Sequence, residues 1–132
     1  MSYTIGQVAK EVGLSVPTLR YYEKEGILPP VKRNENGLRI YDTEDIEWLE
    51  FACCLRETGM NIAEMKEFAK LALQGDETMQ ERVQILQAQK DRVKTQVNNL
   101  MSYIPMIDHK METYTSILNK SNTISKKNRM SG

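Results

Sequence analysis

The sequence contains little cysteine, which limits the disulfides and metal sites that the chain can form. Its two cysteines, Cys53 and Cys54, are neighbours, and adjacent helical residues point about 100° apart, which makes a disulfide between them geometrically awkward. We expect free thiols in a reducing compartment. With one histidine, His109, and no cysteine after Cys54, a single chain lacks the ligands of a metal centre or an iron–sulfur cluster. We therefore expect no metal and no cofactor.

Long apolar runs are also absent. No segment approaches the roughly 18 apolar residues of a membrane span, and the opening MSYTIGQVAK lacks the apolar core of a signal peptide. The sequence contains no glycine-rich phosphate loop and no cluster of histidine, serine and carboxylates, patterns that are typical of enzymes. We expect a cytoplasmic protein that is not an enzyme and does not bind membranes.

Net charge is zero over the 132 residues, but the charge is unevenly distributed. Residues 1–41 carry +2, residues 42–78 carry −7 and residues 79–132 carry +5. A partner responds to the local field of one face and not to the sum. The neutral total therefore does not exclude a polyanionic partner.

Two short helices are predicted at the start of the chain. Thr4 and Gln7 have the spacing of a capping box before an apolar stripe that ends near Gly13. Ser15 can cap a second helix with Pro17 in its first turn, where the missing N–H costs little. Two short helices joined by a glycine-containing turn indicate a helix-turn-helix.

A two-stranded wing is predicted at about residues 31–41. Pro29 and Pro30 prevent a helix at this point, and NENG is a hairpin-turn signal between residues 31–33 and 38–41. Basic side chains give the wing a basic rim.

Two further helices are predicted at about residues 43–73. Thr43 is expected to cap the first, whose opening turn holds three acids, and Gly59 to end it. Asn61 is expected to cap the second, which stops before the QGDE segment. Residues 1–76 are thus predicted to form one domain.

A long helix with a heptad pattern is predicted at residues 77–118. Twelve positions fit one heptad frame, and eleven of them are hydrophobic, which is typical of a coiled coil that needs a partner helix. These seam positions are Met79, Val83, Leu86, Lys90, Val93, Val97, Leu100, Ile104, Ile107, Met111, Tyr114 and Leu118. A homodimer is the economical interpretation.

Three features of residues 77–132 do not follow the apolar heptad pattern. Lys90 is the one polar seam residue, and we expect its ammonium to reach out to water. Pro105 lies off the seam, which favours a kinked continuous helix over a break. Residues 119–132 are polar and basic without periodicity, and a disordered basic tail is predicted there.

The order of these parts indicates DNA binding, because a dimer of helix-turn-helix units places two recognition helices in successive major grooves. On the second helix Leu19 and Tyr22 are expected to face the core, with the Tyr22 hydroxyl in water. Thr18, Arg20 and Tyr21 are expected to project toward solvent. Hydroxyls suit phosphate oxygens, and arginine suits phosphate or the O6/N7 edge of guanine.

The sequence resembles the MerR family of bacterial transcription regulators over about residues 3–72. The resemblance rests on TLRYYEKEGILPPVKRNENGLRIY followed by DIEWLEFACCLRETGM. It implies a mainly α fold, in which a winged helix-turn-helix precedes a long dimerisation helix of an antiparallel coiled coil. It further implies promoter DNA and RNA polymerase as partners, with activation by distortion of an over-long promoter spacer.

The predicted DNA contacts combine this resemblance with the basic rim of the wing. By match to the family, Arg20, Tyr21, Arg39 and Tyr41 contact DNA, while Leu38 stands where the family often has an aromatic residue. The predicted set is Ser15, Thr18, Arg20, Tyr21, Lys32, Arg33, Arg39 and Tyr41.

Cys54 is the candidate sensor residue. The resemblance places it where regulators that respond to aldehydes and nitrosative stress carry a single cysteine, whereas Cys53 is expected in the core. Neighbouring carboxylates on the Cys54 face raise a thiol pKa, so activation requires a basic group such as Arg56, Lys66 or one from a partner's coil. The alternative is that Cys54 is a small packing residue.

Two other functions remain open from the sequence. A constitutive architectural DNA-binding protein or repressor would need no thiol effector. A coiled-coil adaptor that binds protein would show no steep dependence of DNA affinity on salt.

Overall fold

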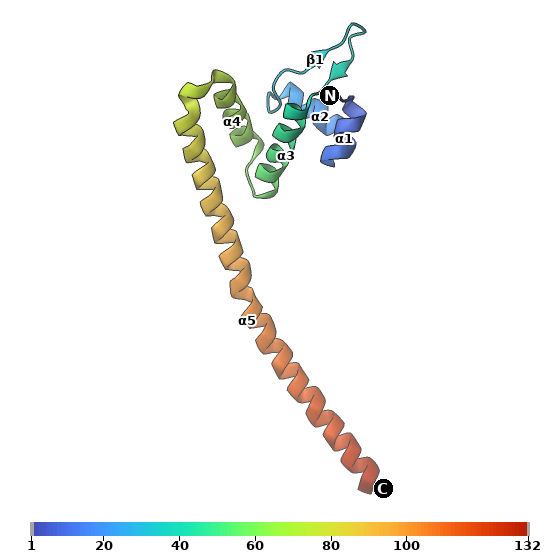
Figure 1. Ribbon diagram of the computed structural model, residues 1–132. Coiled ribbons are helices and arrows are strands. Elements are labelled where there is room, and N and C mark those ends of the chain that lie inside the picture. The colour runs from blue at the N-terminus through green and yellow to red at the C-terminus, as the bar shows by residue number, and fades with distance from the viewer. Residues whose placement is uncertain (1, 132) are drawn as a thin grey trace. The chain divides into compact units, whose positions relative to one another are not determined.

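Figure 1 shows a computed structural model of the chain, which describes residues 2–131, with side chains described up to residue 123. The chain divides into two compact units, Met1–Arg92 and Val93–Gly132, and each is described by itself. The elements in chain order are α1 (Ile5–Val12), α2 (Val16–Lys24), β1 (Lys32–Arg33), β2 (Arg39–Ile40), α3 (Thr43–Glu57), α4 (Ile62–Gln74), the 3₁₀ helix η1 (Asp76–Thr78) and α5 (Met79–Ser131).

Helices α1 and α2 form the predicted helix-turn-helix. The Thr4 hydroxyl accepts a hydrogen bond from the Gln7 N–H at 3.2 Å, and the Gln7 side chain accepts one from the Thr4 N–H at 2.8 Å. Ser15 caps α2, with Pro17 in the first turn. These caps satisfy backbone donors that have no partner within the helix, and they confirm the predicted starts of both helices.

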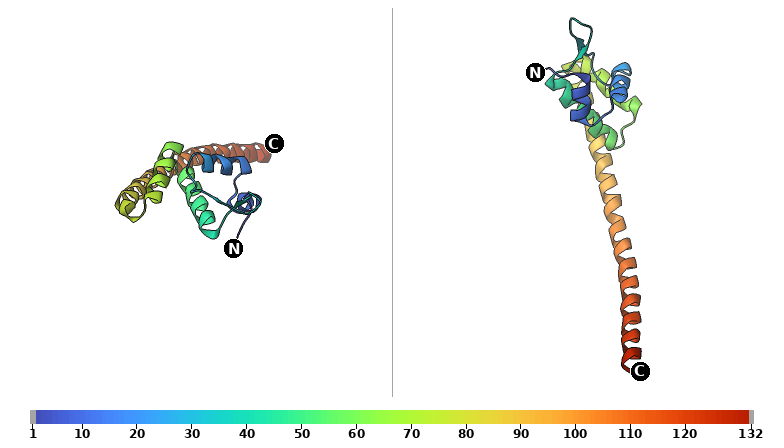
Figure 2. Two further views of the ribbon diagram at one scale, coloured as in Figure 1. Left: turned by 90° about the horizontal axis from the view of Figure 1, so that it is seen from above. Right: turned by 90° about the vertical axis from the view of Figure 1, so that its right-hand side faces the viewer.

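The hairpin of β1 and β2 is the predicted wing, with strands of two residues each. It is antiparallel, with Lys32 opposite Ile40 and Arg33 opposite Arg39. The turn between them uses Gly37, whose φ of 78° lies in the left-handed region that favours glycine. The hairpin projects beyond α1 and α3 in Figures 1 and 2.

The prediction that Thr43 caps α3 was wrong, because the helix begins one residue earlier. Asp42 is the N-cap, because its carboxylate accepts a hydrogen bond from the Asp45 N–H at 2.9 Å. The Asp45 carboxylate accepts one from the Asp42 N–H at 3.0 Å, which closes a reciprocal capping box. Thr43 is therefore the first helical residue. Helix α4 has the predicted Asn61 cap.

The core of the first unit lies between α1, α2, α3 and α4. Trp48 stacks on Phe68 with ring centroids 5.8 Å apart, and its indole N–H donates to the Ile27 carbonyl at 2.8 Å. The fully buried larger side chains are Tyr22, Tyr41, Leu19, Ile27, Leu28, Leu49, Met65 and Val8.

The first turns of α5 pack on this core, so the first unit extends past the predicted boundary at residue 76. Ile85 and Leu86 are partly buried against the core. Gln89 is buried, and its amide donates to the Thr58 carbonyl at 3.0 Å and hydroxyl at 2.7 Å. Leu86, expected in a seam between two chains, is thus partly covered within its own chain.

Helix α5 runs through Pro105 without a break, which confirms the predicted continuity. It also continues from residue 119 to Ser131, where a disordered tail was predicted. Residues 119–131 contain no glycine or proline to end the helix, and Gly132 lies outside the described residues. Among the helices of the described chain, none has the length and apolar character needed to cross a membrane.

Candidate nucleic-acid interface

Helix α2 carries its buried and exposed side chains on different faces, as predicted. Leu19 and Tyr22 are buried in the core, whereas Arg20 is exposed and the Tyr21 side chain is 45% exposed. The Tyr22 hydroxyl accepts a hydrogen bond from Arg56 at 3.0 Å, so the prediction that it lies in water was wrong. Arg20 and Tyr21 are left free to meet a ligand from the solvent side.

Two hydroxyls at the start of α2 are tied to each other. Ser15 Oγ accepts a hydrogen bond from the Thr18 N–H at 3.2 Å and lies 2.8 Å from Thr18 Oγ1. Ser15 is exposed and Thr18 half-buried. Their hydroxyl oxygens lie at the start of α2, on the helix that also carries the exposed Arg20 and Tyr21.

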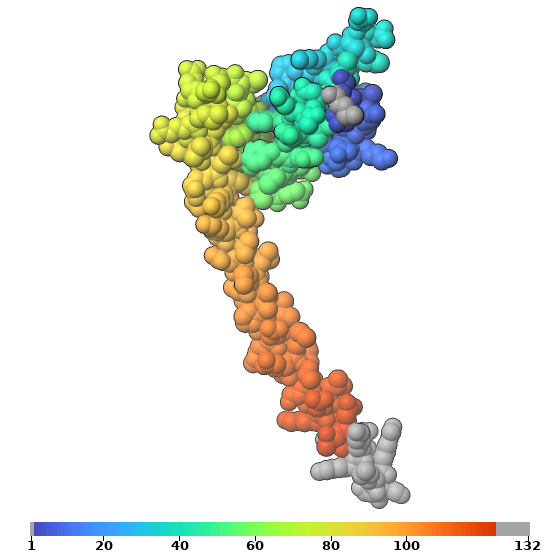
Figure 3. Space-filling model, viewed as in Figure 1, coloured from blue at the N-terminus to red at the C-terminus, as the bar shows by residue number. Residues whose placement is uncertain are grey.

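The wing presents two exposed basic residues, Lys32 and Arg33. The Arg33 guanidinium donates to the Gly37 carbonyl at 2.9 Å, which holds its side chain against the turn of the hairpin. Leu38, at the same turn, is 63% exposed. In the space-filling view of Figure 3 the wing protrudes beside α1.

Arg39 and Tyr41, the other two predicted wing contacts, differ from Lys32 and Arg33. Arg39 Nε lies 2.5 Å from Glu23 Oε2, with side chains 27% and 20% exposed. Tyr41 is fully buried. Its predicted contact with DNA is therefore corrected, because no part of a fully buried side chain is accessible to a duplex.

The buried Tyr41 hydroxyl has no hydrogen-bond partner among the described residues. Burial raises the pKa of this hydroxyl, and the negative charge of Glu23 raises it further. The charges of Arg39 and Arg20 act in the opposite direction. The raised pKa keeps the buried tyrosine neutral.

Three arginines from α2 and the wing line one pocket of about 220 Å³, which we call the arginine pocket. Thr4 and Ile5, at the start of α1, complete its wall. The lining residues are Thr4, Ile5, Arg20, Arg33, Gly37, Leu38 and Arg39. Such a concentration of positive charge suits a phosphate group.

The two cysteines of α3 differ in exposure, as predicted, although Cys53 is not part of the buried core. Cys53 is half-buried and Cys54 exposed. Burial raises the pKa of the Cys53 thiol, which Arg56 partly offsets. Arg56 donates to Tyr22 and Glu57, and Lys66 donates to Glu25. The two basic residues considered as activators of Cys54 are therefore paired with other groups.

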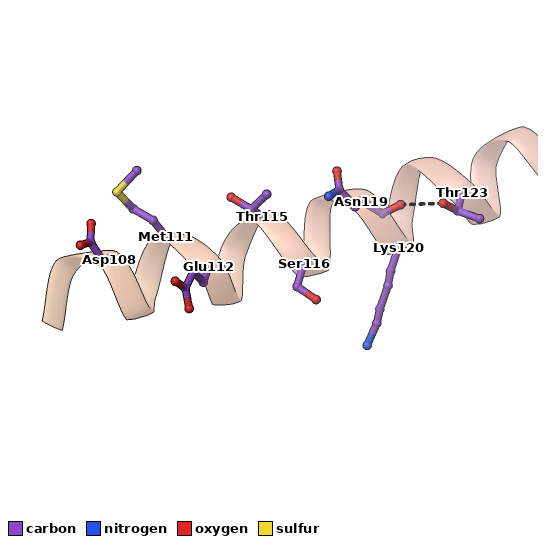
Figure 4. A pocket seen from close by; sticks show the side chains of 8 residues that line it. All are labelled: Asp108, Met111, Glu112, Thr115, Ser116, Asn119, Lys120 and Thr123. Carbon is purple, nitrogen blue, oxygen red and sulfur yellow. Dashed lines mark hydrogen bonds between the residues drawn. The ribbon is translucent and has the colours of Figure 1, made fainter. Parts of the chain in front are cut away.

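A second hollow lies along α5 and is shown in Figure 4. Eight side chains of this single helix line it, between Asp108 and Thr123. Met111 and Thr115 project to one side of the helix, whereas Glu112 and Lys120 project to the other. It is a helix face open to solvent and not an enclosed site. Within the described residues, no three His, Cys, Asp or Glu side chains gather as metal ligands would.

Comparison with known proteins agrees with this geometry. The family model "MerR HTH family regulatory protein" matches residues 3–71, which include the helix-turn-helix, the wing, α3 and most of α4. The chain belongs to the MerR family. It is thus a DNA-binding transcription regulator, as are the curated relatives that it matches.

Three relatives match this MerR regulator over two thirds or more of its length. An uncharacterised HTH-type transcriptional regulator of Haemophilus influenzae is 39% identical over 86% of this chain and 84% of its own length. The regulator AdhR of Bacillus subtilis is 47% identical over 67% of this chain and 64% of its own length. A crystal structure of HiNmlR, a MerR family regulator lacking the sensor domain, bound to promoter DNA, matches with a TM-score of 0.81 at 38% identity, over 88% of this chain and 92% of that one.

Sequence reasoning missed two residues that organise the interface of this MerR regulator. Glu23 pairs with the wing residue Arg39, and Arg56 anchors Tyr22 from α3. Glu23 lies in the TLRYYEKEG segment that carries the family resemblance, but no partner was predicted for it. Arg56 was considered only as an activator of Cys54. Both contacts join residues far apart in the sequence, and no local spacing rule reports them.

Proposed function

We propose that this MerR regulator reads promoter DNA with α2 and the wing. The observation that supports this most is the placement of Arg20, Arg33 and Arg39 around one pocket, next to the exposed Tyr21. Arg20 and Tyr21 would enter the major groove, while Ser15, Thr18 and the wing residue Lys32 contact the backbone. Phosphate contacts of this kind set orientation, and base contacts set sequence.

The proposed active form is a homodimer through α5. The seven seam residues between Val97 and Leu118 are all exposed in the single chain. An apolar stripe of this length is costly in water and is covered when a second helix packs on it. Two copies would present two α2 helices, which suits a pseudo-palindromic site.

The proposed mechanism is distortion of the promoter spacer. A dimer that holds two half-sites can bend and untwist the DNA between them, and the free energy of deformation then depends on the spacer sequence. Activation follows when the two promoter elements reach a geometry that RNA polymerase can bind.

Cys54 is proposed as the sensor of a reactive aldehyde or related electrophile. Its exposure on α3 supports this role, and the half-buried Cys53 with its raised thiol pKa is the poorer nucleophile. Because Arg56 and Lys66 are paired elsewhere, the cation that activates Cys54 is assigned to the partner's coil. The alternative is a constitutive architectural protein or repressor, in which Cys54 only fills space.

The decisive experiment combines DNA binding with thiol chemistry. A duplex selected from random DNA by the protein carries dyes at both ends, and energy transfer between the dyes reports the bend. Formaldehyde or methylglyoxal should change the bend with the wild type and with Cys53→Ser, but not with Cys54→Ser. An equal response from Cys54→Ser would remove Cys54 as the sensor, and no response from the wild type or either variant would favour the alternative. Binding without a steep salt dependence would contradict the DNA interface itself.

A further inference from the structure

Arg39 differs from the other arginines of the arginine pocket, because it already has a carboxylate partner. Its Nε lies 2.5 Å from Glu23 Oε2, in a partly buried ion pair between the wing and α2. Arg33 donates to a neutral backbone carbonyl, that of Gly37. A phosphate that enters this pocket therefore competes with Glu23 for Arg39, whereas it meets no such competitor at the guanidinium of Arg33.

A second observation concerns Tyr41, which follows Arg39 by two residues in the wing. The Tyr41 hydroxyl is buried and donates to no group in the described chain, although a buried hydroxyl without a partner is costly. Glu23 is the carboxylate whose charge acts most strongly on it. The structure thus holds an unused hydrogen-bond donor two residues along the wing from Arg39, the partner of the Glu23 carboxylate.

We propose that Glu23 is a displaceable clamp on Arg39: a backbone phosphate takes over Arg39 when DNA binds, and the released Glu23 carboxylate accepts a hydrogen bond from Tyr41. This inference rests on the proposed DNA interface. Glu23 and Tyr41 are positioning residues, since neither contacts DNA. Arg39 is the contact, and its availability depends on them.

The physical consequence of the clamp is selectivity. A free arginine binds any phosphate, and sequence-independent binding is almost wholly electrostatic. With Glu23 on Arg39, a phosphate must be placed well enough to replace a charge-assisted hydrogen bond. A poorly fitted duplex fails to do so. Tyr41 lowers the cost of release for a well-fitted one, because the carboxylate finds a new donor.

The first test uses Glu23→Gln, which keeps the shape of the side chain and removes its charge. We expect affinity for a random-sequence duplex to rise by about threefold to tenfold, since a partly buried ion pair no longer competes. The slope of log affinity against log salt should steepen by about 1, the contribution of one further phosphate contact. Affinity for a duplex selected by the wild type should rise less, so that discrimination falls.

Glu25→Gln is the matched control. Glu25 also belongs to the end of α2 and pairs with a cation, Lys66, at 3.1 Å, but it is not part of the arginine pocket. The substitution removes the same charge from the same region. Its slope against salt should equal that of the wild type. A slope that steepens equally in both variants would reduce the effect to net charge and overturn the clamp.

The second test is a double-mutant cycle with Tyr41→Phe and Glu23→Ala. Tyr41→Phe should weaken binding of the selected duplex by about threefold or more, the usual worth of one hydrogen bond, and should have no effect in the Glu23→Ala background. Removing an unpaired buried hydroxyl should not lower the unfolding temperature, which separates this effect from misfolding. An equal effect in both backgrounds, or none in either, would overturn the role of Tyr41.

The outcomes separate the clamp from the interface on which it rests. If the wild type shows no salt-dependent DNA binding, the proposed interface fails. If the wild type binds but Glu23→Gln is weaker or unchanged, Glu23 is a brace that holds the wing in place, and the clamp is wrong.

Discussion

The first unit and α5 differ in how far their apolar side chains are buried. In the first unit Leu49, Met65 and Phe68 are buried in a core that the chain completes by itself. Along α5 the side chains of Leu100, Ile104 and Ile107 are all more than half exposed. Large apolar side chains are therefore buried in the first unit and exposed along this part of α5.

This difference shows which part needs a second copy. The first unit completes a buried core within a single chain, although Met79 and Val83, at the start of α5, remain exposed. The exposed seam of α5 has no cover within the described chain, and apolar exposure of that extent marks an interaction surface. Pairs of positions that differ in exposure or in region test how far these differences decide the effect of a change.

The largest effect is expected from a charge in the α5 seam. Ile104→Asp places a carboxylate in each half of a dimer interface, and burial of an unpaired charge costs several kcal/mol. We expect the dissociation constant of the dimer to rise by at least about a hundredfold, measured by sedimentation. Asn98→Asp, at a neighbouring exposed position off the seam, is the control. A dimer that survives Ile104→Asp is not held together at this seam.

The next largest effect contrasts two leucines of the first unit. Leu49→Ala should lower the free energy of unfolding by about 2 to 5 kcal/mol, because it leaves a cavity in a fully buried site. Leu38→Ala, at the exposed turn of the wing, should change it by less than about 0.5 kcal/mol. Denaturant unfolding measures both. Equal losses would mean that the wing is covered in solution.

A smaller effect is expected for exposed cations of the two regions. Arg20→Ala should weaken binding to a selected duplex by roughly 1 to 3 kcal/mol, and it should flatten discrimination if the guanidinium reads a base. Lys110→Ala removes a charge from α5 and should leave affinity nearly unchanged. Fluorescence anisotropy measures both. Full affinity in Arg20→Ala would remove this residue from the interface.

The smallest effect concerns the two thiols of α3. Burial raises the pKa of Cys53, so its thiolate fraction increases only at higher pH than that of an ordinary thiol near about 8.5. Between about pH 7 and about pH 9, iodoacetamide should therefore modify the exposed Cys54 several times faster than Cys53, as mass spectrometry would report. Faster modification of Cys53 would contradict its partial burial in α3.

Local chemistry allowed much of the fold to be predicted. The caps at Thr4, Ser15 and Asn61 use residues three positions apart, and the NENG turn uses four consecutive residues. Such contacts are complete within one turn of chain, so spacing alone reveals them. The wrong choice of Thr43 instead of Asp42 as the cap of α3 also concerns neighbouring residues. An aspartate and a threonine are both good caps, and only the backbone conformation decides between them.

The candidate site could be predicted only in part. The exposure of Arg20 and Tyr21 follows from the helical period of α2. The burial of Tyr41 and its neighbourhood with Glu23 depend on how the wing folds back against α2, and a two-residue strand has no periodicity that reports its faces. The partial burial of Leu86 arises likewise from tertiary packing, which a heptad frame does not include.

The base of the wing is closed by the start of the chain. Tyr3 and Tyr41 exchange two backbone hydrogen bonds, of 2.7 and 2.9 Å, so α1 and α2 both lie inside the loop that these two residues close. Closing a loop of that length costs chain entropy that the helices must first offset. We therefore expect the wing to settle last during folding and to open first under local fluctuation. Amide protons of Tyr3 and Tyr41 should then exchange with solvent earlier than those of α3, even in the intact protein.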